Sequence, residues 1–356
     1  MTYGQSMPMT EGSVYLLRDV DLLNGNISQY LKIGKTIDTT AKRIQQHQTG
    51  NPRKINNIFD ILATGMSEME TYLHHYFSSL RICGEWFDID DTMLNSEVIP
   101  LMNTHLAEQQ ITNAHIQNYE RFKVMPDNGT IRNPSVQEQT WSDELKTAKE
   151  ALVIAKAQHQ IPDFNLRAMI GTNGGIDGVI NLIEKAQADY FDKNSFIASL
   201  TTSQHALCHQ TVTEFKQKVT WQNKPQTLKN LDASLNSNLA TAKSSAPSSI
   251  PLSNMTNGIL SRGSNAVTEH ASWLATRREM AIQEWIIKQK QMVILDSLGA
   301  DQEITGVVSW IRGDVTTPDQ WSLAMAKDNL SAEVTAFTTP KPNHIAVEID
   351  ECRGYP

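Results

Sequence analysis

Two apolar runs separated by a strong turn signal constrain the fold of this chain more than any other feature. Residues 14–17 (Val-Tyr-Leu-Leu) and 30–34 (Tyr-Leu-Lys-Ile-Gly) have the apolar and aromatic content of strands. Asn24-Gly25 between them favours a type I′ turn, because both central positions of that turn need positive φ. The sequence therefore predicts an antiparallel hairpin over residues 13–34. Residues 58–64 predict a third strand.

Two helices and a short closing strand complete this predicted unit. Asp38 can cap a helix over residues 39–48, which the turn residues 49–52 would end. Apolar residues at helical spacing predict a second helix that begins at Ser67. We therefore expect residues 1–95 to form an α+β domain in which helices flank a small antiparallel sheet.

The rest of the chain is predicted to be mainly α-helical. We expect a helical domain over residues 96–231, a Ser/Asn-rich linker or mobile loop over 232–268, and a helical segment with a terminal strand over 269–356. Thr317-Pro318 has the pattern of an N-cap followed by a first-turn proline. An apolar seam that begins at Trp141 suits either a core-facing helix or a self-association surface. No internal repeat is apparent.

Charge and cysteine content narrow the class of protein. The 356-residue chain has a net charge of −8 and 40% hydrophobic residues, which is typical of a soluble protein and not of a general polyanion binder. Residues 32–54 nevertheless hold six basic residues against one acidic residue. Three widely spaced cysteines fit a reducing cytoplasm, and residues 1–12 lack the pattern of a secretory signal. With no apolar run of about 18 residues, we expect a cytoplasmic protein with no membrane partner.

Five residues in and around this basic segment offer the groups that phosphodiester hydrolysis requires. The reaction needs an activated nucleophile, neutralised phosphoryl charge and help for the leaving group. A tyrosine or histidine can handle protons, an arginine and a lysine can clamp a phosphate, and a carboxylate can hold a divalent cation. The candidates are Tyr15, Lys35, Arg43, His47 and Glu70. Each also has a structural alternative, and that of Glu70 is a capping box with Ser67.

Five motifs in this part of the chain occur in a fixed order. They are Ser13-Val14-Tyr15, Tyr30–Thr36 with Lys32-Ile33-Gly34 at its centre, Arg43, Glu70-Thr71-Tyr72-Leu73-His74, and Gly84-Glu85-Trp86-Phe87. In order and spacing they resemble the GIY-YIG nuclease superfamily. More narrowly, they are similar to its phage and bacterial branch, which has K-I-G in place of Y-I-G and a terminal G-E-W-F motif. The resemblance covers roughly residues 13–90 and implies a GIY-YIG-like nuclease domain.

The resemblance implies a role for each candidate residue. Tyr15 would position or deprotonate the attacking water, and His47 would assist the proton transfer. Arg43 would stabilise the pentavalent phosphate, and Lys35 would bind a phosphate oxygen. Glu70 would be the carboxylate ligand of a Mg²⁺ (or Mn²⁺) ion.

Two positions depart from the pattern of the resembled family. Lys32 stands where most members have a second tyrosine, and Glu85 precedes the last strand, near which many members have an asparagine. Glu85 is either a hydrogen-bond acceptor in the site or a surface charge. The other predicted DNA contacts are the basic residues outside the catalytic set, and their alternative is a solvated charged face. These contacts are Lys32, Lys42, Arg53 and Lys54.

Together these patterns predict a metal-dependent endonuclease that hydrolyses DNA phosphodiester bonds in a phage, mobile-element or anti-phage defence context. The alternative is a nuclease-like module without turnover that acts as a nucleic-acid-binding or regulatory protein. The helical C-terminal region would supply target recognition or the contacts of a homo-oligomer. A third interpretation is a helical scaffold that carries an incidental N-terminal domain.

Overall fold

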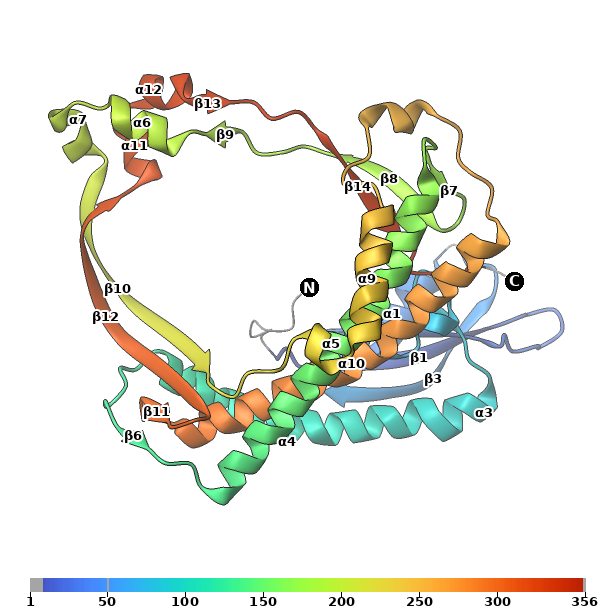
Figure 1. Cartoon of the computed structure of the whole chain (residues 1–356). Helices are drawn as coiled ribbons and strands as arrows, with labels where there is room; N and C mark the ends of the chain where they lie inside the picture. Colours follow the sequence, from blue (N-terminus) through green and yellow to red (C-terminus); the bar gives the residue numbers. More distant parts are fainter. Residues whose placement is uncertain (1–8, 50, 355–356) are drawn as a thin grey trace.

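A computed structural model describes residues 9–49 and 51–354 of the chain. Residues 1–8, part of the segment in which no secretory signal is expected, lie outside the described residues, as does Gly50 in the turn expected after the first helix. An N-terminal α+β unit is followed by a mainly helical region that contains further small sheets (Figure 1). The predicted fold class is therefore confirmed.

The N-terminal sheet has the strand order β3-β1-β2-β5-β4, and all of its neighbouring strands are antiparallel. Its strands are β1 (Gly12–Val20), β2 (Tyr30–Thr36), β3 (Lys54–Ala63), β4 (Arg81–Cys83) and β5 (Trp86–Asp88). The hairpin of β1 and β2 is confirmed. Its turn is not type I′, because Gly25 has a φ of 74° whereas Asn24 has no positive φ. A longer loop over residues 21–29 joins the two strands.

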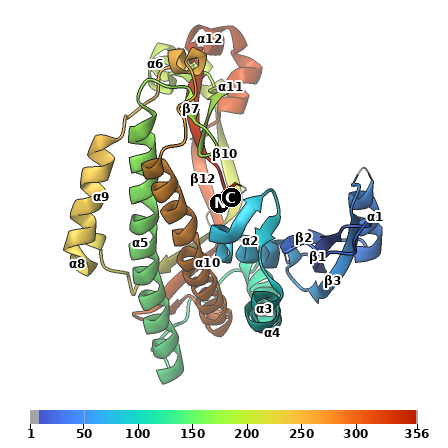
Figure 2. The same ribbon diagram turned by 90° about the vertical axis from the view of Figure 1, so that its right-hand side faces the viewer.

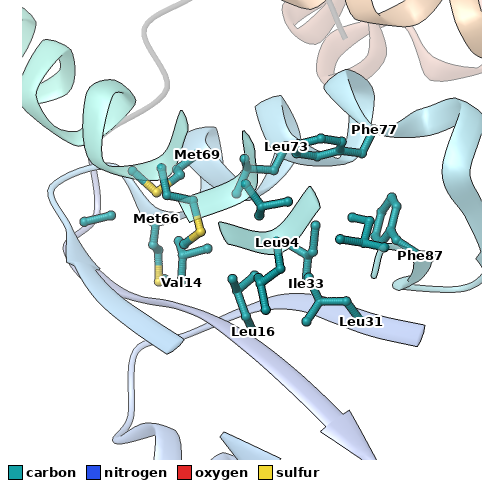
Figure 3. Packing of buried hydrophobic residues seen from close by; sticks show 14 residues of the cluster. Val14, Leu16, Leu31, Ile33, Met66, Met69, Leu73, Phe77, Phe87 and Leu94 are labelled. Atoms are coloured by element: carbon teal, nitrogen blue, oxygen red, sulfur yellow. The ribbon is translucent and has the colours of Figure 1, made fainter. Parts of the chain in front are cut away.

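Helices α1 (Thr40–Gln48) and α2 (Met66–Tyr76) cover opposite faces of this sheet. Alternate residues of β1 therefore enter different cores, as the two-residue period of a strand requires. Leu16 packs with Leu73 of α2 in the larger core, which Figure 3 shows from close by. Tyr15 faces the other way and belongs to a smaller apolar cluster beneath α1.

The starts of both helices differ slightly from prediction. The Thr39 hydroxyl, and not Asp38, accepts the backbone N–H of Lys42 at 3.3 Å and caps α1. Gly65 precedes α2, and no side chain among the described residues caps that helix. The predicted start at Ser67 is therefore one residue late.

Two long helices dominate the C-terminal region. Helices α5 (Val136–Ile170) and α10 (Ser264–Leu298) each have 35 residues and pack along one another. A capping box of Ser135 and Glu138 begins α5. The apolar seam at Trp141 packs into a core shared with α10, so this seam is used within the chain. Between β5 and α5 the chain forms α3 (Asp91–Met93), a π-helical turn (Leu94–Val98), α4 (Ile99–Lys123) and β6 (Ile131–Arg132).

The region between the long helices is less helical than predicted before residue 232 and more ordered than predicted after it. Its elements are β7 (Gly175–Ile176), β8 (Ile180–Lys185), β9 (Tyr190–Phe191), α6 (Lys193–Ser199), α7 (Thr202–Leu207), β10 (His209–Trp221), α8 (Leu228–Leu231), α9 (Ala233–Ser245) and a 3₁₀ turn (Leu252–Thr256). Helix α9 lies along α5 (Figure 2). The predicted linker over 232–268 is therefore wrong for most of its length.

After α10 the chain forms a second series of strands and short helices. They are β11 (Glu303–Ile304), β12 (Val308–Trp321), α11 (Leu323–Asn329), α12 (Ser331–Ala336), β13 (Thr338–Thr339) and β14 (His344–Ile349). The terminal strand is confirmed. Thr317-Pro318 begins no helix and instead lies in β12 at a bulge, next to Asp319 with a φ of 54°. A bulge accepts proline because the backbone N–H is not needed there.

The C-terminal region contains an internal duplication, contrary to the sequence-based expectation. Each 35-residue helix ends at a glycine with nearly the same φ, 55° for Gly171 and 58° for Gly299. A two-residue strand and then a longer strand follow each glycine. The identical residues Ile176 and Ile304 lie 128 positions apart, as do the two glycines. The sequence hides this relationship because the identities are few and are concentrated just after the helices.

The two halves of the duplication exchange their last strands. Strand β8 of the first half pairs with β14 of the second, and β12 of the second pairs with β10 of the first. Equivalent backbone hydrogen bonds end the two ladders. The N–H of Asp350 donates to the carbonyl of Val179 at 2.8 Å, and the N–H of Gln222 donates to that of Val307 at 2.9 Å. In Figure 1 these two ladders, the short helices and the long helices trace a ring.

The N-terminal domain is docked on α10 by its α2 side. Tyr72 of α2 packs with Trp285 of α10, and the backbone N–H of Arg353 donates to the carbonyl of Arg81 in β4 at 2.8 Å. Helix α1 lies on the side that faces away from α5 and α10 (Figure 2). No helix in the described part of the chain is both long and apolar enough to cross a membrane.

Candidate active site

The face of the sheet beneath α1 holds the first group of candidate residues. Tyr15 lies opposite Gly34 in the β1–β2 ladder, and its side chain is only 1% exposed. A Cβ atom at Gly34 would lie 2.6 Å from the Tyr15 hydroxyl, so only glycine leaves room for this ring. The glycine of the K-I-G motif therefore positions the tyrosine of the first motif.

The Tyr15 hydroxyl contacts His47 at the end of α1. The hydroxyl oxygen lies 3.2 Å from Nε2 of His47, and the two rings meet edge to face. Burial raises the pKa of Tyr15, while the neighbouring Arg43 guanidinium acts in the opposite direction. Burial, together with the charges of Lys32 and Arg43, lowers the pKa of His47. At neutral pH the pair is therefore a phenol beside an uncharged imidazole.

Arg43 lies one turn before His47 on α1 and presents an unused donor. Its Nη1 donates to Gln46 at 2.8 Å, but its buried Nε has no hydrogen-bond partner among the described residues. Buried donors without a partner are uncommon in proteins and call for an explanation, such as an ion or ligand. An anion beside Tyr15 would satisfy this group.

Lys32 and Glu85 form an ion pair on the same face of the sheet. Lys32 lies opposite Leu17 in the ladder, which places its side chain on the Tyr15 face. The Lys32 side chain is 10% exposed and that of Glu85 is 38% exposed. Burial raises the pKa of Glu85, but the hydrogen bond and charge of Lys32 outweigh burial and lower it. Glu85 is therefore a hydrogen-bond acceptor within the site and not a free surface charge.

Glu70 and Lys35 form a second group on the α2 face. Lys35 lies opposite Val14, which belongs to the α2 core, and its Nζ lies 2.8 Å from the Glu70 carboxylate. Glu70 is 8% exposed and does not cap its helix, so the capping-box alternative with Ser67 is wrong. The sheet thus divides the five predicted catalytic residues into two groups. The two groups still interact electrostatically, because the Glu70 charge raises the pKa of Tyr15.

The four predicted DNA contacts differ in their availability. Lys32 is held by Glu85, and Lys42 forms an exposed ion pair with Asp38 at 3.0 Å. Arg53 lies 3.1 Å from Asp19, whereas Lys54 is exposed at the start of β3 and has no ion-pair partner among the described residues. A phosphate would compete with the acidic partners for Lys42 and Arg53.

One further histidine lies between the two groups. His74 follows Glu70 by one helical turn, and its Nε2 lies 2.9 Å from the carbonyl of Ile33, the central residue of K-I-G. Because a carbonyl only accepts, Nε2 carries the proton of the neutral ring. Burial lowers the pKa of His74, whereas the Glu70 and Glu85 charges raise it. The spacing of one turn from Glu70 was the available signal for this residue.

No family model, curated protein or solved structure matches the chain. The resemblance to the GIY-YIG superfamily therefore remains a proposal, and the evidence for a site is its geometry. That geometry brings Tyr15, Arg43 and His47 together and places Lys32 and Glu85 beside them.

Glu70 is the carboxylate that would hold a divalent cation in this site, since Glu85 is already paired with Lys32. Among residues 9–49 and 51–354, no three His, Cys, Asp or Glu side chains are gathered as a metal-binding group. Mg²⁺ does not need such a group, because it often binds through one or two carboxylates, waters and substrate phosphates. Glu70 fits that mode once Lys35 has left its carboxylate. The donor set therefore suits a cation that binds together with a phosphate.

Proposed function

We propose that this protein is a Mg²⁺- or Mn²⁺-dependent DNA endonuclease of the GIY-YIG type. The observation that carries the proposal is the contact of 3.2 Å between Tyr15 and His47, beside an Arg43 whose buried Nε has no partner among the described residues. A proton acceptor, a proton relay and a cation with one unpaired N–H donor on one face suit attack on a phosphodiester.

The two groups of side chains would each contribute to hydrolysis. A water oxygen attacks phosphorus, and its proton passes through the Tyr15 hydroxyl to the uncharged His47. Arg43 and Lys35 offset the negative charge that develops on the phosphoryl oxygens. One P–O bond breaks, and the leaving oxygen takes a proton from solvent. A cation held by Glu70 would supply further charge neutralisation.

DNA is the proposed substrate because basic residues are concentrated around the site in an otherwise acidic chain. The proposal draws on the six basic residues of segment 32–54 and on the outward orientation of α1 (Figure 2). The sequence resemblance adds a phage, mobile-element or anti-phage context. The C-terminal region would serve target recognition or self-association, and sedimentation of the full chain tests the latter.

Cleavage of plasmid DNA in the presence of Mg²⁺ or Mn²⁺ tests the proposed activity. We expect wild-type protein to cut, and Arg43→Ala to lower the rate about 10²- to 10³-fold, as for removal of a transition-state donor. Tyr15→Phe and Glu70→Gln should also lose activity. Arg121→Ala, on α4 outside the site, is the matched control and should cut normally. Absence of cutting by wild-type protein with either cation would reject the enzyme.

The alternative is a nucleic-acid-binding module without turnover. Its support is that the Glu70 carboxylate is already held by Lys35 and that of Glu85 by Lys32. A binding module would retain DNA in gel-shift assays, with weaker binding by Arg43→Ala, but would not cut under any cation. Cutting that depends on Glu70 separates the two functions.

A further inference from the structure

Helix α1 carries two of the proposed catalytic residues, Arg43 and His47, but has little apolar support. Of its nine residues, all within the described part of the chain, Thr40 alone is buried, and Ile44 joins the small apolar cluster around Tyr15. A helix of this length is marginally stable by itself in water. It faces away from α5 and α10 and packs mainly on β3 (Figure 2). Polar contacts are therefore needed to hold α1 in place over the sheet.

Gln48, the last residue of α1, makes the most extensive of these polar contacts. Its side-chain amide accepts the backbone N–H of Ile55 at 2.9 Å and donates to the carbonyls of Asn51 and Arg53, at 3.0 and 2.9 Å. At the other end of the helix, the Thr40 hydroxyl makes one longer bond, of 3.3 Å, to a side chain of β3. A single amide thus fixes the end of α1 to the start of β3 and to the turn before it.

This anchor connects the two partners of the proposed proton transfer. Gln48 directly follows His47 in the chain, and Ile55, whose N–H it accepts, packs with Tyr15 in the small apolar cluster. We propose that Gln48 is a positioning residue that sets the contact of 3.2 Å between His47 and the Tyr15 hydroxyl. It acts through His47 and contributes no group to the reaction. The inference rests on the proposed function and adds a residue that the catalytic set does not include.

Replacing Gln48 by methionine tests the anchor without DNA or metal. Gln48→Met keeps a side chain of similar size and removes all three hydrogen bonds. The Tyr15 and His47 rings, whose centres lie 6.3 Å apart, should give a nuclear Overhauser effect (NOE) in NMR of the full chain. This NOE should be lost or much weaker in Gln48→Met. An NOE of wild-type strength in Gln48→Met overturns the inference.

The same helix offers a matched control. Gln45 is exposed, and its side chain has no hydrogen-bond partner among the described residues, so Gln45→Met should keep the NOE. Gln48→Asn is a second variant at the anchor, which keeps the amide on a side chain that is one methylene shorter. Because this amide cannot reach all three partners at once, Gln48→Asn should also weaken the NOE. Circular dichroism shows whether the variants are folded.

DNA cleavage separates this inference from the proposed function. A displacement of about 1 Å can cost about 10²-fold in rate, so Gln48→Met should lower kcat about 10- to 100-fold. In a His47→Ala background the same substitution should have almost no further effect, because no imidazole is left to position. An equal loss of kcat in both backgrounds would indicate a general structural role and overturn the inference. Loss of the NOE in Gln48→Met, with no cleavage even by wild-type protein, would instead reject the enzyme, and with it a positioning role in catalysis.

Discussion

Replacing Glu138 by glutamine tests the hydrogen bonds that connect α5 with α10 and with β6. Glu138 is 3% exposed and accepts two hydrogen bonds from Arg132, at 2.9 and 2.7 Å. It also accepts the backbone N–H of Ser135 and the hydroxyl of Ser297, both at 2.7 Å. The carboxylate therefore connects α5 with α10 and with the segment that contains β6. Glutamine keeps the size of the side chain and removes its charge.

The size of the effect follows from the pKa of this carboxyl group. Arg132, outweighing the opposing effect of burial, lowers the pKa of Glu138 from 4.5 to about 2, with help from Ser135 and Ser297. One pKa unit corresponds to about 1.4 kcal/mol, so the ionised group contributes about 3 kcal/mol to the free energy of unfolding at pH 7. Because the folded-state pKa is lowered, this contribution is present above pH 4.5 and is lost as the pH falls through about 2.

Urea unfolding followed by circular dichroism measures this difference. Glu138→Gln should be less stable than wild type by about 3 kcal/mol at pH 7, and by about 1 kcal/mol or less near pH 2.5. Glu303→Gln is the matched control, because Glu303 has no ion-pair partner among the described residues and should change stability little at either pH. A difference for Glu138→Gln that is the same at both pH values would refute the reasoning.

Two further substitutions test the position of the site and the docking of its domain. Gly34→Ala should displace the buried Tyr15 ring and cost about 1–3 kcal/mol in urea unfolding; the cost should largely disappear in a Tyr15→Ala background, and an equal cost there would contradict the close approach. Glu351 binds Arg277 at 2.9 Å and also pairs with Arg81. Glu351→Gln should therefore speed hydrogen exchange at the Arg353 amide, and unchanged exchange would show that the tail docks without this carboxylate.

The N-terminal fold could be predicted because its signals are local. The strands at residues 14–17 and 30–34 are apolar and adjacent in the chain, and the connecting loop contains a turn-forming Gly25. Most residues of β10, in contrast, are exposed on both faces, so no apolar alternation marks this strand. Its partner is about a hundred residues away, with Val212 opposite Thr317. Local propensity carries no information about such a pairing.

The candidate site shows the same limit. The contact of Tyr15 with the α1 side chains follows from motif order, and the structure brings these groups together. The pairing of Lys32 with Glu85 depends on the register of β2 against β5, where Lys32 lies opposite Trp86. The sequence therefore marked both residues as departures without showing that they are partners. From the sequence alone, Glu70 could equally have capped its helix. Only the fold shows that its carboxylate contacts Lys35.

The duplication determines how many candidate active sites each ring carries. Two identical copies of such a half, joined by the same strand exchange, would offer two equivalent docking faces and would carry two N-terminal domains. In this chain the halves are covalently joined and have diverged: α10 carries the N-terminal domain, while α9 lies along α5. Each ring therefore has one candidate active site. An enzyme built this way would cut both strands of a duplex through two successive events or through two molecules.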